Sequence, residues 1–435
     1  MKFEQLQKFR QQAYQCLGNA KDATFELADA VMTTRHISCL GDLAMSALFR
    51  REWSSAYEAL QDCRPDTEQL MQLYIQQISQ VERPVLAIDP TAWLRPYAPT
   101  LKERTYEHQP TALPGGIPVG VGQGYSTIAL IPTISGSWAL PLRHERITSW
   151  DNPIAFGAQQ LAQVCQYFRH RPIALFDSEY GCAPLVKATA AIAADKLMRL
   201  RSNRCLWSAP PSYGGKGRPQ VHGKQFKLND SSTWWEPEQT LESVEPKLGK
   251  IRLRNWDNLH FRGSPKHSMT LILVERLDTV TGQLKTQPLW LAWVGLQMPP
   301  LLEIWQLYLR RFALEHWYRL AKQTLHWTVP KLSTPEQCSR WSDLMPLLTW
   351  QLWLAKDLVR ETRLPWQKSL PQLTPGRVAQ SMLPLLIKIG SPAVAPKRRG
   401  NSNGWQTGKP RTPRCRYPVV KKGKGRFQNS PKLIS

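Results

Sequence analysis

Three acidic residues stand where carboxylates could carry metal-dependent chemistry. Asp89 and Asp177 each end a short apolar run, and each run predicts a buried strand. Strand ends in an open α/β sheet face the crevice where ligands bind, so the two carboxylates could meet there. Glu315 lies within 301–327, which lacks Pro and Gly and therefore predicts one long helix. Each Asp could instead cap the turn that follows it, as Asp commonly does.

The predicted helix would carry Glu315 on a charged stripe. Tyr308, Arg311 and Lys322 precede and follow it at offsets that, at about 100° per residue, keep all four side chains within about 60°. Apolar residues occupy much of the remaining helix surface, so the stripe could line a site. The alternative is a solvated face, on which an Arg311–Glu315 pair would contribute a few tenths of a kcal/mol.

The chemistry that needs two Asp, one Glu and neighbouring cations is phosphoryl transfer on nucleic acid. Two divalent ions about 3.5–4 Å apart clamp the attacking and leaving oxygens in such reactions. Ions of the magnesium type prefer carboxylate oxygens, which two Asp and one Glu can supply. Cations and a phenol beside the Glu would position the adjoining phosphates.

The helix residues form a motif with a known counterpart. In residue types and in all three gaps it resembles the Tyr-Arg-Glu-Lys signature of bacterial insertion-sequence transposases of the DDE class. The motif is Tyr308-x2-Arg311-x3-Glu315-x6-Lys322.

The two Asp positions extend this resemblance. Segments 86–89 and 174–177 resemble the places where the family carries its first two acids, and 197–204 resembles the segment after the second acid. The resemblance covers roughly residues 80–330. It implies an RNase H-like core, an α/β fold with a mixed sheet flanked by helices, which is interrupted by a β-rich insertion.

The resemblance also implies an activity and a set of roles. Asp89, Asp177 and Glu315 would bind two Mg²⁺ ions, for which Mn²⁺ could substitute. The protein would cut DNA at insertion-sequence ends and join the free 3′-OH to target DNA, which is cut-and-paste transposition. Its partner would be double-stranded DNA, bound by a homodimer. The residues expected to contact DNA near the transposon end are Tyr308, Arg311 and Lys322.

Some members of the family also flip a base onto a tryptophan of the insertion. Stacking of this kind contributes about 1–3 kcal/mol per base. An ordinary core or hairpin aromatic is the alternative for each tryptophan of that region. The candidates by location are Trp207, Trp234, Trp235 and Trp256.

Net charge supports a polyanionic partner. The chain has 57 Lys plus Arg and 33 Asp plus Glu, a formal charge of +24 over 435 residues. Residues 397–435 contain 12 of the cations and no acid, so half of the excess lies in the tail. That segment could be a solubilising flexible end or could bind phosphates without regard to sequence.

Several classes are excluded by sequence. No run of 18 apolar residues could span a membrane, and the N-terminus lacks the apolar core of a signal peptide. The eight cysteines are scattered without Cys-x-x-Cys pairs, which favours a reducing cytoplasm, with the protein on the nucleoid when it binds DNA. The Gly120-x-Gly122-x-Gly124 segment lacks dinucleotide-loop spacing and no Walker motif occurs, so we expect no nucleotide cofactor and place these glycines in a loop at a hairpin entry.

Five segments are expected along the chain. They are an all-helical N-terminal region over 1–82 that could bind DNA ends, the first part of the catalytic core over 83–204, the β-rich insertion over 205–288, a helical second part of the core over 289–395, and a disordered basic tail over 396–435.

Two other functions remain open. The chain could be a non-enzymatic DNA-binding protein derived from a transposase, in which the acids are structural or vestigial. It could also be a different nuclease on the same fold, acting on RNA. Inverted repeats flanking several genomic copies would favour the transposase.

Overall fold

The computed structural model describes residues 2–78, 83–113, 116–133, 136–215, 217–245, 249–279, 281–397, 408, 410 and 413–422. The predicted boundary at residue 82 lies outside these residues, as do Trp405 and Phe427 of the tail.

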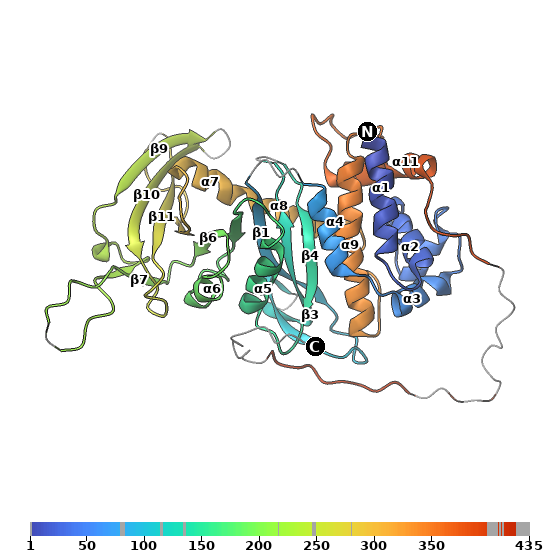
Figure 1. Cartoon of the computed structure of the whole chain (residues 1–435), viewed down its shortest axis with the longest axis horizontal. Coiled ribbons are helices and arrows are strands. Elements are labelled where there is room, and N and C mark those ends of the chain that lie inside the picture. The colour runs from blue at the N-terminus through green and yellow to red at the C-terminus, as the bar shows by residue number, and fades with distance from the viewer. Residues whose placement is uncertain are drawn as a thin grey trace.

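The predicted α/β class is confirmed. Helices flank one large mixed sheet, and a helical N-terminal region packs beside it (Figure 1). Among the described residues, no helix is long and apolar enough to cross a membrane. The segment boundaries themselves stay predictions.

The N-terminal region is helical because its apolar residues recur at helical spacing. Leu6, Phe9 and Tyr14, for example, are buried on a single helix. This region packs against α9, the long helix Pro335–Ala355 (Figure 1). Its elements are α1 (Lys2–Gln15), α2 (Lys21–Thr33), the 3₁₀ helix η1 (Leu40–Met45), α3 (Trp53–Asp62) and α4 (Thr67–Gln76).

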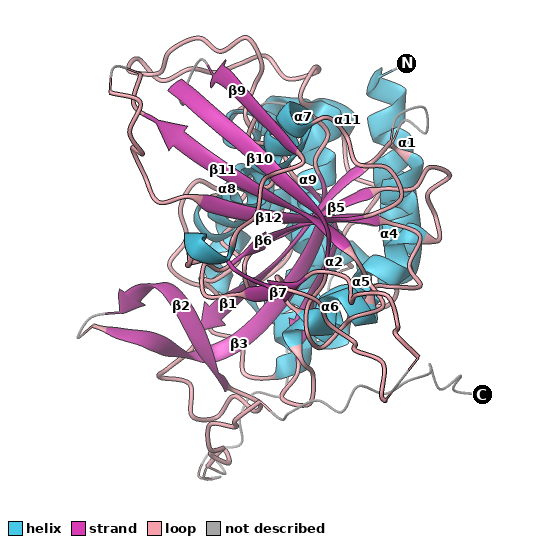
Figure 2. Cartoon of the chain, turned by 90° about the vertical axis from the view of Figure 1, so that its left-hand side faces the viewer, coloured by secondary structure: helices cyan, strands magenta, loops and turns pink. Residues whose placement is uncertain are grey.

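The central sheet has ten strands in the main path and its branch. The order is β2-β3-β1-β5-β6-β12-β11-β10-β9, with β4 paired to β3 (Figure 2). Only the β1–β5 and β5–β6 pairs are parallel. The core strands are β1 (Val85–Leu94), β2 (Thr105–Leu113), β3 (Ile117–Leu130), β4 (Leu140–Ile147), β5 (Ile173–Phe176), β6 (Asp195–Leu200) and β12 (Leu289–Val294).

The strand β1 runs past its predicted stop. Sequence placed the end of the strand at Asp89 because Pro90 follows, but pairing with β3 continues as far as Leu94. Pairing with β5 ends earlier, at Ile88, so β1 has a neighbour on one side only beyond that point. A strand that is open on one side tolerates proline, since the missing N–H leaves no ladder partner unpaired.

The predicted insertion is β-rich and continues the central sheet. β11 pairs with β12, so β9, β10 and β11 add to the same sheet, while β7 and β8 form a separate two-stranded one (Figures 1 and 2). The insertion strands are β7 (Cys205–Trp207), β8 (Gln225–Lys227), β9 (Gln239–Glu245), β10 (Gly249–Leu259) and β11 (Met269–Leu277).

The predicted helix 301–327 is two helices. α7 (Leu301–Arg310) and α8 (Phe312–Gln323) are separated at Arg311. The Arg311 N–H donates to Tyr308 O, and the Leu314 N–H donates to Arg311 O, so both bonds close three-residue turns. This local tightening replaces the usual four-residue pattern and marks a break that helical periodicity cannot show.

One further expectation on local extent is wrong. The glycine-rich segment expected as a loop at a hairpin entry belongs mostly to β3. The helix α6 (Ala183–Ala188) is short, and α9 contains Pro346 in its interior. Tertiary packing outweighs the local preference at this proline, because Pro346 and the α9 residues beside it are buried.

Helices cover both faces of the sheet around β1. α5 (Pro153–Cys165) brings Gly157 against Ile88, whereas Tyr318 of α8 donates a hydrogen bond to the carbonyl of Asp89. The remaining C-terminal helices are α10 (Pro375–Gln380) and α11 (Met382–Ile389).

Candidate active site

The sheet register brings the two predicted Asp residues together. Ile88 of β1 pairs in parallel with Phe176 of β5, and both residues are fully buried. Asp89 and Asp177 are the next residues on each chain, so they emerge side by side where the β1–β5 pairing ends. The buried apolar runs hold the two backbones, and the strand pairing sets the register of the acids.

Arg311 gathers all three predicted acids around one guanidinium. Its nitrogens lie 3.6 Å from Asp89 Oδ2, 3.7 Å from Asp177 Oδ1 and 2.8 Å from Glu315 Oε1. These carboxylates come from β1, from the turn after β5 and from α8. The Arg311 side chain is only 4 % exposed, whereas that of Glu315 is 50 % exposed. One buried cation therefore stands among three acids of increasing exposure.

The charges of this cluster do not balance. Burial raises the pKa of Asp89 to about 8; Arg311 opposes the shift, while Asp177 and Glu315 add to it. Burial alone would lower the pKa of Arg311, but Asp89 and Asp177 outweigh it and raise that pKa above its ordinary value. Two guanidinium groups, those of Arg311 and Arg199, carry less positive charge than the three carboxylates carry negative charge, so the site favours a further cation or a proton.

The donor types fit a divalent ion of the magnesium type. All three acids supply hard oxygen ligands, and Asp177 Oδ1 is buried without a hydrogen-bond partner. Among the described residues, however, no three His, Cys, Asp or Glu side chains lie close enough together to hold a metal ion. The oxygen donors therefore suit an ion of the magnesium type, but the three side chains would have to move closer together to bind it.

Tyr308 lies beside the cluster and is buried. Its ring is 1 % exposed, stacks on Trp305 and lies 5.8 Å from the Arg311 guanidinium. In this conformation it supports Arg311 from within the protein. The predicted DNA contact of Tyr308 stays a prediction.

Lys322 points toward β1, away from the guanidinium. Its Nζ donates to Thr91 Oγ1 at 3.0 Å, and burial lowers its pKa. Thr91 lies two positions beyond Asp89 on β1, hence on the same face of the sheet. Lys322 thus borders the site along the strand, and its DNA contact also stays a prediction.

Sequence reasoning missed several residues of this site. Arg199 of β6 places Nη1 3.9 Å from Asp177 Oδ1, with its side chain 45 % exposed. The charge of Glu179 adds to the raised pKa of Asp89, and Tyr318 binds the Asp89 carbonyl. The pairing of β5 with β6 could have pointed to Arg199, but the sequence does not show which strands are neighbours.

The candidate stacking tryptophans divide into two groups. Trp256 is fully buried and Trp234 is half-buried, and both pack around Phe226 in the core of the insertion. Trp235 meets the same ring edge-on. Trp207 is half-buried beside His222. The first three have the environment of core aromatics, which was the alternative expected for them.

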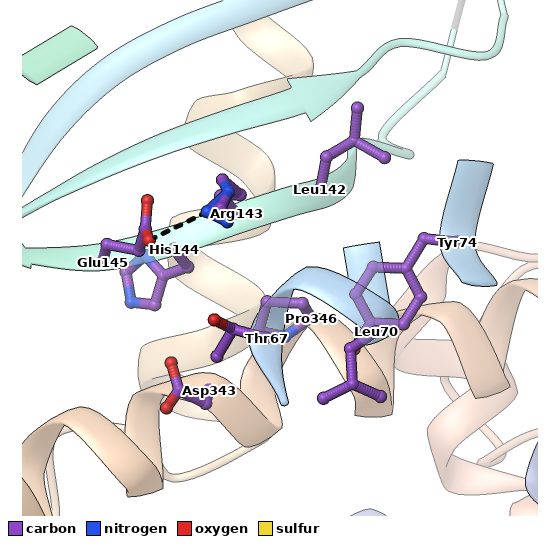
Figure 3. A pocket seen from close by; sticks show the side chains of 9 residues that line it. All are labelled: Thr67, Leu70, Tyr74, Leu142, Arg143, His144, Glu145, Asp343 and Pro346. Carbon is purple, nitrogen blue, oxygen red and sulfur yellow. Dashed lines mark hydrogen bonds and ion pairs between the residues drawn. The ribbon is translucent and has the colours of Figure 1, made fainter. Parts of the chain in front are cut away.

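A separate cavity lies between α4, β4 and α9 (Figure 3). Burial raises the pKa of Asp343 to about 8, and Glu145 adds to this, while Arg143 opposes it. Arg143 is bound to Glu145 at 3.3 Å and to Glu68 at 2.6 Å. Ionisable side chains form part of its lining, but the cavity lies between the N-terminal helices and the sheet, outside the acid cluster.

Comparison with known families identifies the class of the protein. The model of the DDE superfamily endonucleases matches residues 12–260, and the chain belongs to this family. The family comprises nucleases of the transposase type that act on DNA and generally use divalent metal ions. The match includes Asp89 and Asp177 and ends before Glu315. The comparison with curated proteins finds no matching relative.

Proposed function

We propose that the chain is a DDE transposase of an insertion sequence, which cuts DNA at the element's ends and transfers the 3′ ends to target DNA. The observation that carries this proposal is the convergence of Asp89, Asp177 and Glu315, from three separate elements, on one buried guanidinium. The Tyr-Arg-Glu-Lys pattern, the RNase H-like organisation of the core and a bacterial insertion-sequence origin belong to the same proposal.

In this proposal Asp89, Asp177 and Glu315 would hold two Mg²⁺ ions. When bound, such ions activate water or a 3′-OH and neutralise charge on the phosphate. The chain's own residues do the positioning: the β1–β5 pairing holds both Asp backbones, and the Tyr318 hydroxyl fixes the Asp89 carbonyl. Arg311 and Arg199, beside Asp177, would orient phosphates of the bound strand, since guanidinium groups bind phosphate oxygens in a fork.

The test is cleavage of DNA that carries the sequences flanking the gene, in Mg²⁺ or Mn²⁺. Asp89→Asn, Asp177→Asn and Glu315→Gln should each lower cleavage at least about 1,000-fold, which corresponds to about 4 kcal/mol of barrier. Glu303→Gln, on the exposed side of α7, is the matched control and should leave cleavage unchanged. Full cleavage by any of the three acid variants would overturn the assignment.

One observation favours a second candidate, a DNA-binding protein derived from a transposase. The acids are already paired with Arg311, and among the residues described they form no group that could hold a metal as they stand. This candidate predicts duplex binding without cleavage in either metal, and a gene without flanking inverted repeats. Action as a homodimer around paired ends, in the cytoplasm, belongs to the first candidate.

A further inference from the structure

The described end of the basic tail lies along the edge strand β2. The Tyr417 N–H donates to Pro99 O, and the Val420 N–H donates to Arg104 O, both at 2.8 Å. Val420 also forms an isolated parallel bridge with Thr105, the first residue of β2. We call residues 413–422 the strap; its red trace runs along the lower edge of Figure 1. The strap therefore extends the sheet by backbone pairing.

A lysine anchors the strap in space that a glycine leaves free. Lys422 Nζ lies 2.9 Å from Glu107 Oε2, and the Lys422 side chain is 19 % exposed. A Cβ on Gly124 would lie 2.8 Å from Lys422 Nζ and 2.9 Å from the Glu107 carboxylate. A Cβ on Gly122 would lie 2.2 Å from Trp93 O, so this glycine allows close strand packing. The glycine-rich segment thus makes room for a neighbouring strand and for the lysine anchor.

Two further contacts hold the strap between these points. Arg104 Nη2 donates to Tyr417 O at 3.2 Å, and the Arg104 residue is 5 % exposed. Lys102 Nζ stands 5.0 Å from the centre of the Tyr417 ring, a cation–π contact. The strap is therefore fixed at its middle and at its end.

The docked strap presents unpaired cations to solvent. Arg414, Arg416 and Lys421 are exposed, and none forms an ion pair with a described residue. The two acids nearest in sequence to Lys102 are occupied: Glu103 binds Arg146 and Glu107 binds Lys422. The result is a positive ridge along the β2 edge.

We propose that this ridge, formed by Lys102, Arg414, Arg416 and Lys421, is a binding surface for the phosphate backbone of duplex DNA. The inference rests on the proposed function, in which DNA is the substrate. Residues 397–435 contain no acid, so a second copy of the strap would be repelled, while a polyanion would be attracted. At Thr105, the first residue of β2, the edge of the sheet is already paired with the strap.

The ridge is distinct from the acid cluster. Gly124 lies three positions along β3 from Thr127, the partner of Asp89, which is about 10 Å of strand. Three positions is an odd spacing, so Gly124 and Thr127 face opposite sides of the sheet. The strap therefore lies on the other side of the sheet edge from the acids.

The first measurement is the salt dependence of binding to a 40-base-pair duplex of arbitrary sequence, with the full chain in EDTA. The triple variant Arg414→Gln, Arg416→Gln, Lys421→Gln should lower the slope of log K against log salt by about 2.7, which is 0.9 for each lost phosphate contact. The matched control, Lys331→Gln, Lys368→Gln, Lys388→Gln, removes the same charge from exposed sites elsewhere and should leave the slope unchanged.

The second measurement separates a docked ridge from a loose basic arm. Glu107→Gln removes a negative charge, so long-range electrostatics alone predicts tighter DNA binding. If Glu107 instead anchors the strap, binding weakens several-fold and hydrogen exchange at the Tyr417 and Val420 amides speeds up. Glu303→Gln, at an exposed site of α7, is the charge-matched control and should bind slightly tighter or as the wild type does.

An unchanged salt slope in the triple variant would overturn the proposal that the ridge binds DNA. Tighter binding by Glu107→Gln would overturn the docked arrangement, and so would unaltered amide exchange at the strap. Concentration-dependent dimerisation that the triple variant abolishes, without a change in DNA affinity, would assign the strap to a second copy and reject the proposal. None of these measurements depends on cleavage. They can therefore contradict the DNA-binding role of the ridge without contradicting the proposed role of the three acids.

Discussion

Two buried arginines show how a structural ion pair differs from a site. Arg10 binds Asp29 through two parallel bonds of 2.8 Å, and both side chains are at most 4 % exposed. One cation meets one anion, and the guanidinium also donates to Gln351 Oε1 and to the Gly390 carbonyl. Arg311 is equally buried but meets three carboxylates, of which only Glu315 lies within 3 Å. A buried pair with matched charges stabilises the fold. A cluster with excess negative charge can accept a further cation or a proton.

Breaking the matched pair should have the largest effect on stability. Arg10→Met leaves Asp29 buried without its counterion, so the free energy of unfolding should fall by about 3–5 kcal/mol. Chemical denaturation at neutral pH measures it. A loss below about 1 kcal/mol would contradict the structural role of the pair.

Removing the arginine of the unmatched cluster should cost less and respond to metal. Arg311→Met should lower the free energy of unfolding by about 2 kcal/mol, because Asp89 can take up a proton and Glu315 is half exposed. Mn²⁺ should then raise the melting temperature of the variant more than that of the wild type, since a cation would compensate the same carboxylates. Arg319→Met, exposed on α8, is the control and should show neither effect.

The cavity acid Asp343 extends the comparison to a half-buried carboxyl that forms no ion pair with a described residue. Its pKa in the folded protein is about 8, above the ordinary value for an aspartate, so the folded state holds the proton more tightly. Stability should therefore fall as pH rises from about 4 to 8. Asp343→Asn should reduce that slope, to which Asp89 also contributes, and should be more stable by about 1–3 kcal/mol at pH 8.

A surface carboxyl supplies the control for this pH dependence. Lys2 and Lys356 lower the pKa of Asp357, so its contribution should be present at neutral pH and be lost on acidification. Denaturation between about pH 4 and 8 checks the sign for Asp343, and denaturation below about pH 4 checks the sign for Asp357. A wild-type slope that Asp343→Asn leaves intact would assign the pH dependence to other groups.

The smallest effect is expected at the most exposed member of the cluster. Glu315→Gln should change the free energy of unfolding by less than about 1 kcal/mol, because an ion pair with a half-exposed partner contributes little. The same variant should abolish cleavage. A large loss of stability would place Glu315 in the scaffold with Asp29.

Much of the site could be anticipated from the chain. Asp89 and Asp177 were expected to meet because each follows a buried apolar run, and parallel pairing in register brings them together. The Arg311–Glu315 pair, which four-residue spacing allows and which was part of the alternative of a solvated face, forms, but with Arg311 buried. These features depend on local patterns, which a sequence displays directly.

Other features depend on contacts between distant residues. Two elements run against local preferences: the helix breaks at Arg311, and β1 continues past Pro90. In both cases, contacts with neighbouring strands and helices outweigh the local preference. The addition of β9–β11 to the main sheet and the approach of Arg199 to Asp177 need the strand order, which has no local signal.

What the sequence determined by itself is the α/β class, the two strand-end acids and the charged helical stripe, since strand and helix periods and residue chemistry are local properties. Only the tertiary structure decided that one buried guanidinium stands among the three acids, and that the glycines of β3 make room for Lys422 of the strap. Both arrangements join residues more than 200 positions apart, and their energies arise from burial and charge proximity that exist only in the folded chain.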